Sequence, residues 1–196
     1  MLPLILASSS VYRAQLMQRL RLPFETDPAA IDETRGTDEP AAALVERRAR
    51  EKAAAVAPRH PAALVIGSDQ VAVCGTDILG KPGTVAKAVE QLHKLAGRQV
   101  EFLTGLCLLN TASGRLQSCV ETTPVEFRKL GEREIHAYVQ AEQPLDCAGA
   151  FKSEGLGVAL FKSIGGRDPS ALIGLPLIAL CEMLRAENCN PLLSED

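Results

Sequence analysis

The stretch Leu64-Val65-Ile66-Gly67-Ser68-Asp69-Gln70 constrains the fold of this chain more than any other. Its three bulky apolar residues predict a short strand that is buried on both faces. The chain then turns polar, and the carboxylate of Asp69 follows the apolar run closely. In α/β proteins, side chains just past the carboxyl end of a strand face the crevice above the sheet. Asp69 is therefore either a candidate catalytic acid or, in the simpler interpretation, the cap of a turn.

Length and composition set the class of protein. With 196 residues, 46% of them hydrophobic, the chain can bury a sizeable core, and no repeat or linker divides it, so residues 1–196 are expected to form a single domain. A net charge of −3 gives no basic field for a nucleic-acid polymer. No apolar run is long enough to span a membrane and no charged leader is present, which predicts a cytoplasmic protein without membrane association. The six cysteines and three histidines lack metal-ligand spacing, so reduced thiols are expected.

Strand-like and helix-like segments alternate along the chain, which predicts an α/β fold. A first strand at 4–7 leads through three serines into a helix, and a second helix runs from Pro40 to Ala57. Thr84 is the expected cap of a third helix, which Gly97 ends. The expected elements after these are a long hairpin with arms at 100–109 and 116–128, a short helix at 131–141 and a last helix that begins near Pro176.

Three cations stand near predicted helices. The serine turn Ser8–Ser10 precedes a helix on whose inward stripe Arg13 falls. An inward arginine at a helix start calls for an anionic partner, and free helix amides with serine hydroxyls form a phosphate cradle. Lys52 borders the apolar stripe of the helix at 40–57, and Lys81 is the only charge in its glycine-proline loop. Each of these side chains could equally pack its apolar stem against the core.

Two acids, Glu33 and Asp69, complete the set of candidate residues. Glu33 belongs to an acidic pair with Asp32 in a polar loop, where acids are commonly only solvated. A divalent cation, however, takes one or two carboxylates from a protein when phosphates supply its other ligands. Neither a Walker A nor a GxGxxG pattern is present. The residues therefore fit either a polyphosphate ester bound with a metal ion or an ordinary α/β domain with peripheral charges.

Six short motifs occur in the order found in the Maf family of nucleotide pyrophosphatases, which the chain resembles from Leu4 through its final helix. They are Leu4–Ser10 with Arg13, Asp32-Glu33, Glu51-Lys52-Ala53, Gly67-Ser68-Asp69, Gly80-Lys81-Pro82 and Gly149-Ala150-Phe151. The resemblance implies hydrolysis of a nucleoside triphosphate to the monophosphate and pyrophosphate. It also implies a mixed β-sheet flanked by helices, similar to the fold of inosine triphosphatases, a homodimer, and dependence on a divalent metal cation, Mg²⁺ or Mn²⁺.

The resemblance suggests a role for each candidate residue. Asp69 is expected to act as general base toward the water that attacks the α-phosphorus. Glu33, together with Asp69, is expected to place the metal ion. Four residues are expected to bind phosphate oxygens, with the three cations also offsetting charge in the transition state: Ser8, Arg13, Lys52 and Lys81.

Three further positions resemble the subgroup that hydrolyses 7-methyl-GTP: Tyr12, Gln70 and Glu154. Maf proteins that act on dTTP and UTP typically carry Arg in place of Tyr12 and Gln in place of Glu154. Trp is the more familiar residue at the first position, and Tyr12 keeps its aromatic character. N7-methylation makes guanine cationic, and stacking of a cation on an aromatic face contributes about 0.5–2 kcal/mol. A carboxylate at Glu154 can also accept from N1–H and the exocyclic amine of that base.

Other interpretations of these residues stay open. Taken alone, Tyr12 is an ordinary helix-surface aromatic, and Glu154 is a surface acid paired with Lys152. The chain could be a dTTP/UTP pyrophosphatase of the same family or a non-enzymatic module that binds nucleotides. A purely structural subunit would leave Arg13 and Lys52 on inward helix stripes without a partner, which is costly.

Overall fold

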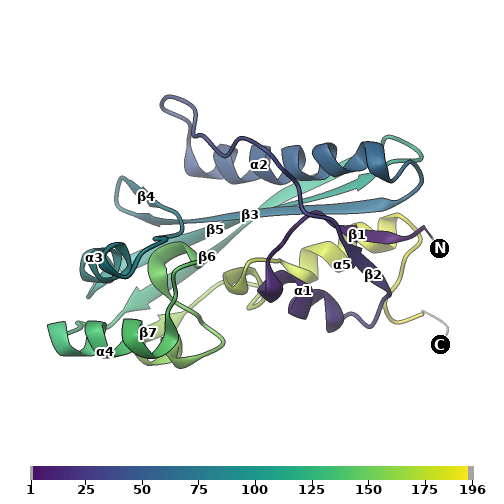
Figure 1. The fold of residues 1–196 in the computed structure, drawn as a ribbon. Helices are drawn as coiled ribbons and strands as arrows, with labels where there is room; N and C mark the ends of the chain where they lie inside the picture. The colour runs from purple at the N-terminus through teal and green to yellow at the C-terminus, as the bar shows by residue number, and fades with distance from the viewer. Residues whose placement is uncertain (1, 194–196) are drawn as a thin grey trace.

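The computed structural model describes residues 2–193, in which seven strands form one sheet with β4 on its edge (Figure 1). The strands are β1 (Leu4–Leu6), β2 (Phe24–Thr26), β3 (Leu64–Cys74), β4 (Asp77–Leu79), β5 (Gln99–Asn110), β6 (Leu116–Phe127) and β7 (Phe161–Ile164). Their order is β2-β1-β3-β5-β6-β7, and β4 pairs with β3. Pairing is parallel among β2, β1 and β3 and antiparallel elsewhere, so the mixed sheet and the long β5–β6 hairpin are confirmed.

Helices cover both faces of this sheet. They are α1 (Val11–Gln18), α2 (Ala41–Val56), α3 (Val85–Leu95), α4 (Glu132–Glu142) and α5 (Leu177–Ala186), with 3₁₀ turns at Ala57–Arg59, Ala148–Ala150, Leu156–Leu160 and Ala171–Ile173. Figure 1 shows α2 along one face and the other helices on the opposite side, with α1 and α5 near β1 and with α3 and α4 at the far end. Within residues 2–193, no helix combines the length and apolar character that crossing a bilayer requires.

Two helices begin at the capping residues that the sequence predicted. Ser10 caps α1 by accepting from the backbone N–H of Arg13 at 3.4 Å. Thr84 caps α3 in the same way, and Gly97 follows that helix with a φ of 72°, a value that favours glycine. Within residues 2–193 the six cysteines form no disulfide with one another, which agrees with the expected reduced thiols.

The prediction that a strand ends before Asp69 was wrong. β3 continues without interruption from Leu64 to Cys74 because β5 pairs with it from Leu64 through Val73. The polar residues stay extended because they find partners: the hydroxyl of Ser68 donates to the carbonyls of Gly105 at 2.8 Å and Gly174 at 2.9 Å. A strand can therefore carry polar side chains through its middle when neighbouring elements satisfy them.

Asp69 nevertheless lies at an opening in the sheet, for a different reason. On the outer edge of β3, β1 pairs only with Leu64–Ile66, and β4 pairs only with Ala72–Cys74. Residues 67–71 lie between these two neighbours. Side chains from both faces of β3 can reach that gap, since neither β1 nor β4 covers it.

Two glycines bring α2 unusually close to the sheet. A Cβ added to Gly67 would lie 2.0 Å from the carbonyl oxygen of Ala49, and one added to Gly105 would lie 2.2 Å from that of Val45. Any side chain at either position would therefore push the helix away. This close approach carries the face of α2 that follows Val45 and Ala49 directly over the middle of β3.

Candidate active site

A cavity of about 520 Å³ opens at the gap in the edge of β3. Every residue singled out from the sequence lines it except Ser8: Tyr12, Arg13, Glu33, Lys52, Asp69, Gln70, Lys81 and Glu154. They come from α1, the loop before α2, α2 itself, β3, the loop after β4 and the segment after α4. Segments far apart in the sequence thus meet at one cavity, as expected if the candidate residues form a single site.

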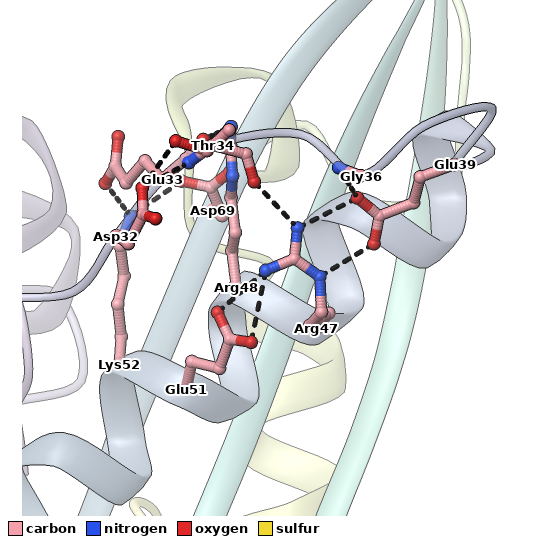
Figure 2. Close-up of polar contacts among 10 residues, drawn as sticks. All are labelled: Asp32, Glu33, Thr34, Gly36, Glu39, Arg47, Arg48, Glu51, Lys52 and Asp69. Atoms are coloured by element: carbon pink, nitrogen blue, oxygen red, sulfur yellow. Dashed lines mark hydrogen bonds and ion pairs between the residues drawn. The ribbon is translucent and has the colours of Figure 1, made fainter.

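A cluster of acids and cations lies where α2 faces β3, and Glu33, Arg48, Lys52 and Asp69 of this cluster line the cavity (Figure 2). The Lys52 Nζ lies 2.6 Å from Asp69 Oδ1 and 2.9 Å from Glu33 Oε1. Lys52 and Asp69 are both buried, so water screens their attraction only weakly. The ammonium of Lys52 therefore bridges the two carboxylates that the sequence suggested as metal ligands.

Arg48 is a site residue that the sequence reasoning missed. Its Nη1 lies 3.2 Å from Asp69 Oδ2, its Nη2 donates to the backbone carbonyl of Glu33, and its side chain is 14% exposed. Both oxygens of Asp69 therefore have a cationic partner. The available signal was helical spacing, because Arg48 precedes Lys52 by four residues and so shares its face of α2.

Arg13 reaches the cavity from α1 and is held there by two hydrogen bonds. Its Nε donates to the carbonyl of Gly174 at 2.8 Å, and its Nη1 donates to the hydroxyl of Ser8 at 3.4 Å. Burial lowers the pKa of Arg13, and the nearby charges of Asp69 and Glu33 oppose that shift. Ser8 itself is buried and also accepts from the N–H of Ser10, so its hydroxyl orients Arg13. Direct binding of phosphate by Ser8 stays a prediction.

A second cluster in the cavity lining, here called the aromatic end, combines an aromatic ring with acids. Tyr12 lies there with Cys147, Asp146 and Glu154. Burial, followed by the nearby thiol and carboxylates, raises the pKa of the Tyr12 phenol well above its usual value. Burial and Asp146 raise the pKa of Cys147 to about 12, so ring and thiol are both neutral at physiological pH. The charge at this end therefore comes from the two carboxylates, of which the sequence reasoning singled out only Glu154.

The alternative pairing of Glu154 with Lys152 is not found. Lys152 Nζ instead donates to the backbone carbonyl of Glu142 at 2.6 Å. The carboxylate of Glu154 accepts from the hydroxyl of Ser153 at 3.2 Å and borders the cavity. Among residues 2–193, no lysine or arginine forms an ion pair with Glu154 or Asp146. This end of the cavity is therefore free to receive a cation.

Gln70 lines the cavity, but its amide nitrogen is already engaged. It donates to the hydroxyl of Thr104 at 2.9 Å and to the carbonyls of Ala171 at 2.9 Å and Leu172 at 3.1 Å. These bonds hold the segment 171–174, three residues of which also line the cavity. The contacts point to Gln70 shaping the wall, and a direct role in base selection stays a prediction.

The loop that carries Glu33 is fastened to α2 by Arg47 as well as Arg48 (Figure 2). The guanidinium of Arg47 contacts Glu39 at 2.7 Å and Glu51 at 2.9 Å, and it also donates to the carbonyl of Thr34 at 3.2 Å. These bonds tie a segment without helix or strand to a rigid helix. Glu33 can therefore stay near Asp69 although its side chain is 56% exposed.

The described residues contain no group of three or more His, Cys, Asp or Glu side chains placed to hold a metal ion. The carboxylates of Glu33 and Asp69 are joined by the ammonium of Lys52. A pair of carboxylates suits Mg²⁺ or Mn²⁺ when substrate phosphates and water complete the shell, whereas it does not suit a cage built by protein ligands alone. The donor set therefore fits a cation that arrives with a phosphorylated ligand.

A cation-lined cavity on a mixed sheet defines an α/β protein suited to phosphate esters. The family model described as Maf-like protein matches residues 3–187, and the chain belongs to this family. Curated relatives named 7-methyl-GTP pyrophosphatase are 56% identical in Alcanivorax borkumensis, 58% in Alkalilimnicola ehrlichii and 57% in Pseudomonas aeruginosa. Each match covers 94% of this chain, and the matches cover 93%, 92% and 96% of those relatives, respectively.

Two solved structures share the fold at low sequence identity. The Staphylococcus aureus Ham1 protein is 15% identical, with a TM-score of 0.57 over 94% of this chain and 99% of that one. A HAM1 protein from Coxiella burnetii is 18% identical, with a TM-score of 0.51 over 82% of this chain and 91% of that one. These likenesses support the expected fold class.

Proposed function

We propose that this chain hydrolyses 7-methyl-GTP to 7-methyl-GMP and pyrophosphate. The proposal rests on two groups of residues in the cavity lining that differ in chemistry. Lys52 and Arg48 lie beside Asp69 where α2 faces β3. Another part of the cavity lining combines the neutral ring of Tyr12 with two carboxylates that form no ion pair within residues 2–193. 7-Methyl-GTP has the complementary form, with an anionic triphosphate and a cationic base. The name of the curated relatives agrees with this substrate.

The chemistry would begin with Asp69. Its carboxylate accepts a proton from a water molecule, and the water oxygen attacks the α-phosphorus. The bond between the α-phosphorus and the bridging oxygen breaks, and pyrophosphate leaves with the electron pair. Asp69 lies beside the cations rather than at the aromatic end, which supports a role at the phosphates.

The cations supply charge stabilisation. Arg13, Lys52 and Lys81 reach the cavity from three different elements, so they can surround a triphosphate. Arg13 is held by Gly174 and Ser8, which limits the rearrangement needed when charge develops in the transition state. Lys81 comes from the loop after β4, and its side chain is exposed.

Glu33 and Asp69 would hold Mg²⁺ or Mn²⁺ together with phosphate oxygens. When bound, a divalent cation offsets phosphate charge and polarises the oxygens that it contacts. Lys52 now joins the two carboxylates, so it would give up at least one of them and turn to the phosphates. Lys52 and the two carboxylates all line the cavity in which the phosphates would bind.

The base would bind at the aromatic end. A 7-methylguanine ring stacked on Tyr12 brings a positive charge toward Asp146 and Glu154. The carboxylate of Glu154 accepts hydrogen bonds from N1–H and the exocyclic amine, which are better donors in the methylated base. Unmethylated GTP lacks the charge and should bind more weakly.

The biological setting belongs to the same proposal. The chain would act in the cytoplasm as a homodimer and clear modified nucleotides, with a small nucleotide rather than a nucleic-acid polymer as its substrate. The net charge of −3 supports the last point, and the family resemblance supports the others. Light scattering of the purified protein measures the mass in solution, and the mass of one chain would contradict the dimer.

A pyrophosphate-release assay tests the proposed activity. The purified protein is given 7-methyl-GTP, GTP, dTTP and UTP side by side, with Mg²⁺ or Mn²⁺ present. We expect the highest kcat/KM with 7-methyl-GTP. A preference for dTTP and UTP would assign the chain to the other substrate class of this family. Tight nucleotide binding without pyrophosphate release would indicate a non-enzymatic binding module.

A further inference from the structure

Arg48 is a cation of the cavity to which the mechanism above gives no role. We propose that Arg48 is a further phosphate-binding residue, which the free protein holds on Asp69 and which the substrate draws away. The inference rests on the proposed function, because the phosphates in question are those of the proposed substrate. It adds that binding of substrate is what frees the catalytic carboxylate.

The contacts of Arg48 leave part of its hydrogen-bonding capacity unused. Nη1 pairs with Asp69 Oδ2 and Nη2 with the Glu33 carbonyl, while Nε is buried and has no partner in residues 2–193. A guanidinium always carries its charge and offers donors in a fork that matches phosphate oxygens. A buried donor without a partner is uncommon, and Nε can gain one when the guanidinium turns toward a phosphate oxygen, as the proposed exchange requires.

The neighbouring arginines of α2 show that this orientation is specific. Arg47 pairs with Glu39 and Glu51, and Arg50 pairs with Glu46 and the hydroxyl of Ser118. Of the three arginines, Arg48 is the one that lines the cavity. In Figure 2 it extends from α2 toward Glu33 and Asp69, whereas Arg47 turns toward Glu39.

The state of Asp69 in the free protein explains why an exchange is needed. Lys52 contacts Oδ1 at 2.6 Å and Arg48 contacts Oδ2 at 3.2 Å, so each carboxylate oxygen already faces a cation. A triphosphate carries more negative charge than one carboxylate and competes for Arg48. Once Arg48 turns to a phosphate oxygen, Oδ2 is free to accept the proton of the attacking water.

Calorimetric titration with inorganic tripolyphosphate in metal-free buffer tests this inference. The variants are Arg48→Gln and Arg48→Lys, and Arg50→Gln is the matched control on the same helix. We expect Arg48→Gln to weaken binding about 10- to 100-fold, the range of a charge-assisted hydrogen bond. Arg48→Lys should weaken it by about threefold or more, since it loses the fork but keeps the charge. Arg50→Gln should bind as the wild-type protein does.

A second measurement addresses the competition between Asp69 and phosphate. Asp69→Asn should tighten tripolyphosphate binding, because it removes the anion that holds Arg48. In the Arg48→Gln background the same change should tighten binding less. Equal tightening in both backgrounds would show that Asp69 does not restrain Arg48, and it would overturn the exchange.

The remaining outcomes separate the inference from the proposed function. Wild-type affinity in folded Arg48→Gln, or in Arg48→Lys if the first variant does not fold, overturns the inference, as does a wild-type protein that does not bind tripolyphosphate. Loss of affinity in Arg48→Gln upholds phosphate binding by Arg48 even if the wild-type protein releases no pyrophosphate from 7-methyl-GTP. In that case the proposed function fails and the phosphate site stands.

Discussion

The central residue of the site is a carboxylate surrounded by cations. Asp69 is buried in the middle of β3, with Lys52 and Arg48 on its two oxygens. A buried carboxylate needs such partners, since it loses its hydration on folding. The same partners make it dependent on the ligand, because anions that enter the cavity compete for them. The cations that stabilise buried Asp69 are therefore also the groups that bind phosphate in the proposed reaction.

Asp69→Asn should lower turnover of 7-methyl-GTP by about 10²- to 10⁴-fold, the usual contribution of a general base. The amide keeps the shape of the side chain and cannot accept the proton of water. Nucleotide binding should remain measurable by calorimetry. Turnover close to that of the wild-type protein would exclude Asp69 as the base.

Glu154→Gln should lower kcat/KM for 7-methyl-GTP about tenfold or more, because a neutral amide loses the charge-assisted contact with the cationic base. The decrease in kcat/KM for GTP should be smaller. The ratio of kcat/KM for 7-methyl-GTP to kcat/KM for GTP is therefore the quantity to compare. Glu90→Gln, an exposed change on α3 outside the cavity, is the matched control. An unchanged ratio in Glu154→Gln would refute its role at the base.

At the scale of elements, α2 determines the geometry of the site. It supplies Arg48 and Lys52, and it fastens the loop of Glu33 through Arg47. Its position depends on Gly67 and Gly105, where the backbone of the helix meets the sheet. Gly67 in β3 and Gly105 in β5 thus determine where α2 places Arg48 and Lys52.

Gly67→Ala should destabilise the fold by about 1–3 kcal/mol or more, since the added methyl group overlaps a backbone carbonyl of α2 that cannot rotate away. Urea denaturation measures the change in the free energy of unfolding. Gly80→Ala is the control, because nothing lies within 4 Å of the Cβ it would add. Equal stability of the two variants would contradict the close approach of α2.

The contribution of the Arg47–Glu39 ion pair to the stability of the fold should depend on pH. The hydrogen bonds from Arg47 lower the pKa of Glu39 from its ordinary 4.5 to about 2. Because the folded-state pKa lies below the unfolded one, this contribution to stability is present above about pH 4.5 and is lost as the pH falls toward 2. Glu39→Gln should therefore make the urea midpoint fall less between pH 5 and pH 2.

The control for this prediction is Glu25→Gln. Glu25 is exposed on β2, and in the described residues it forms no ion pair. Its replacement should leave the pH dependence of the midpoint as it is in the wild-type protein. An equal effect of both substitutions would show that the bond between Glu39 and Arg47 is not the cause.

Periodicity and capping signals predicted most elements, since these depend on local sequence. The caps Ser10 and Thr84 are examples. The continuity of β3 through Asp69 was missed, because it depends on pairing with β5 and on partners from α2 that are distant in sequence. Arg48 was missed for a related reason. A run of arginines on a helix does not reveal which one faces a cavity until the helix has been docked on the sheet.

At the scale of the whole molecule, the site lies where the sheet leaves one strand edge uncovered. β1 and β4 pair with opposite ends of β3, and the cavity opens between them. On the side of α1 and α5, the apolar core around Leu64 and Ile66 is separate from the one around Ala72 and Cys74. The polar middle of β3 lies between these two cores. The arrangement leaves room for a ligand without opening either core.

The most direct test of the central claim is hydrolysis of 7-methyl-GTP in ¹⁸O-labelled water, followed by mass spectrometry of both products. Attack of water on the α-phosphorus predicts that 7-methyl-GMP carries the label and that pyrophosphate carries none. The label in pyrophosphate, release of inorganic phosphate with a diphosphate product, or the absence of hydrolysis would contradict the account.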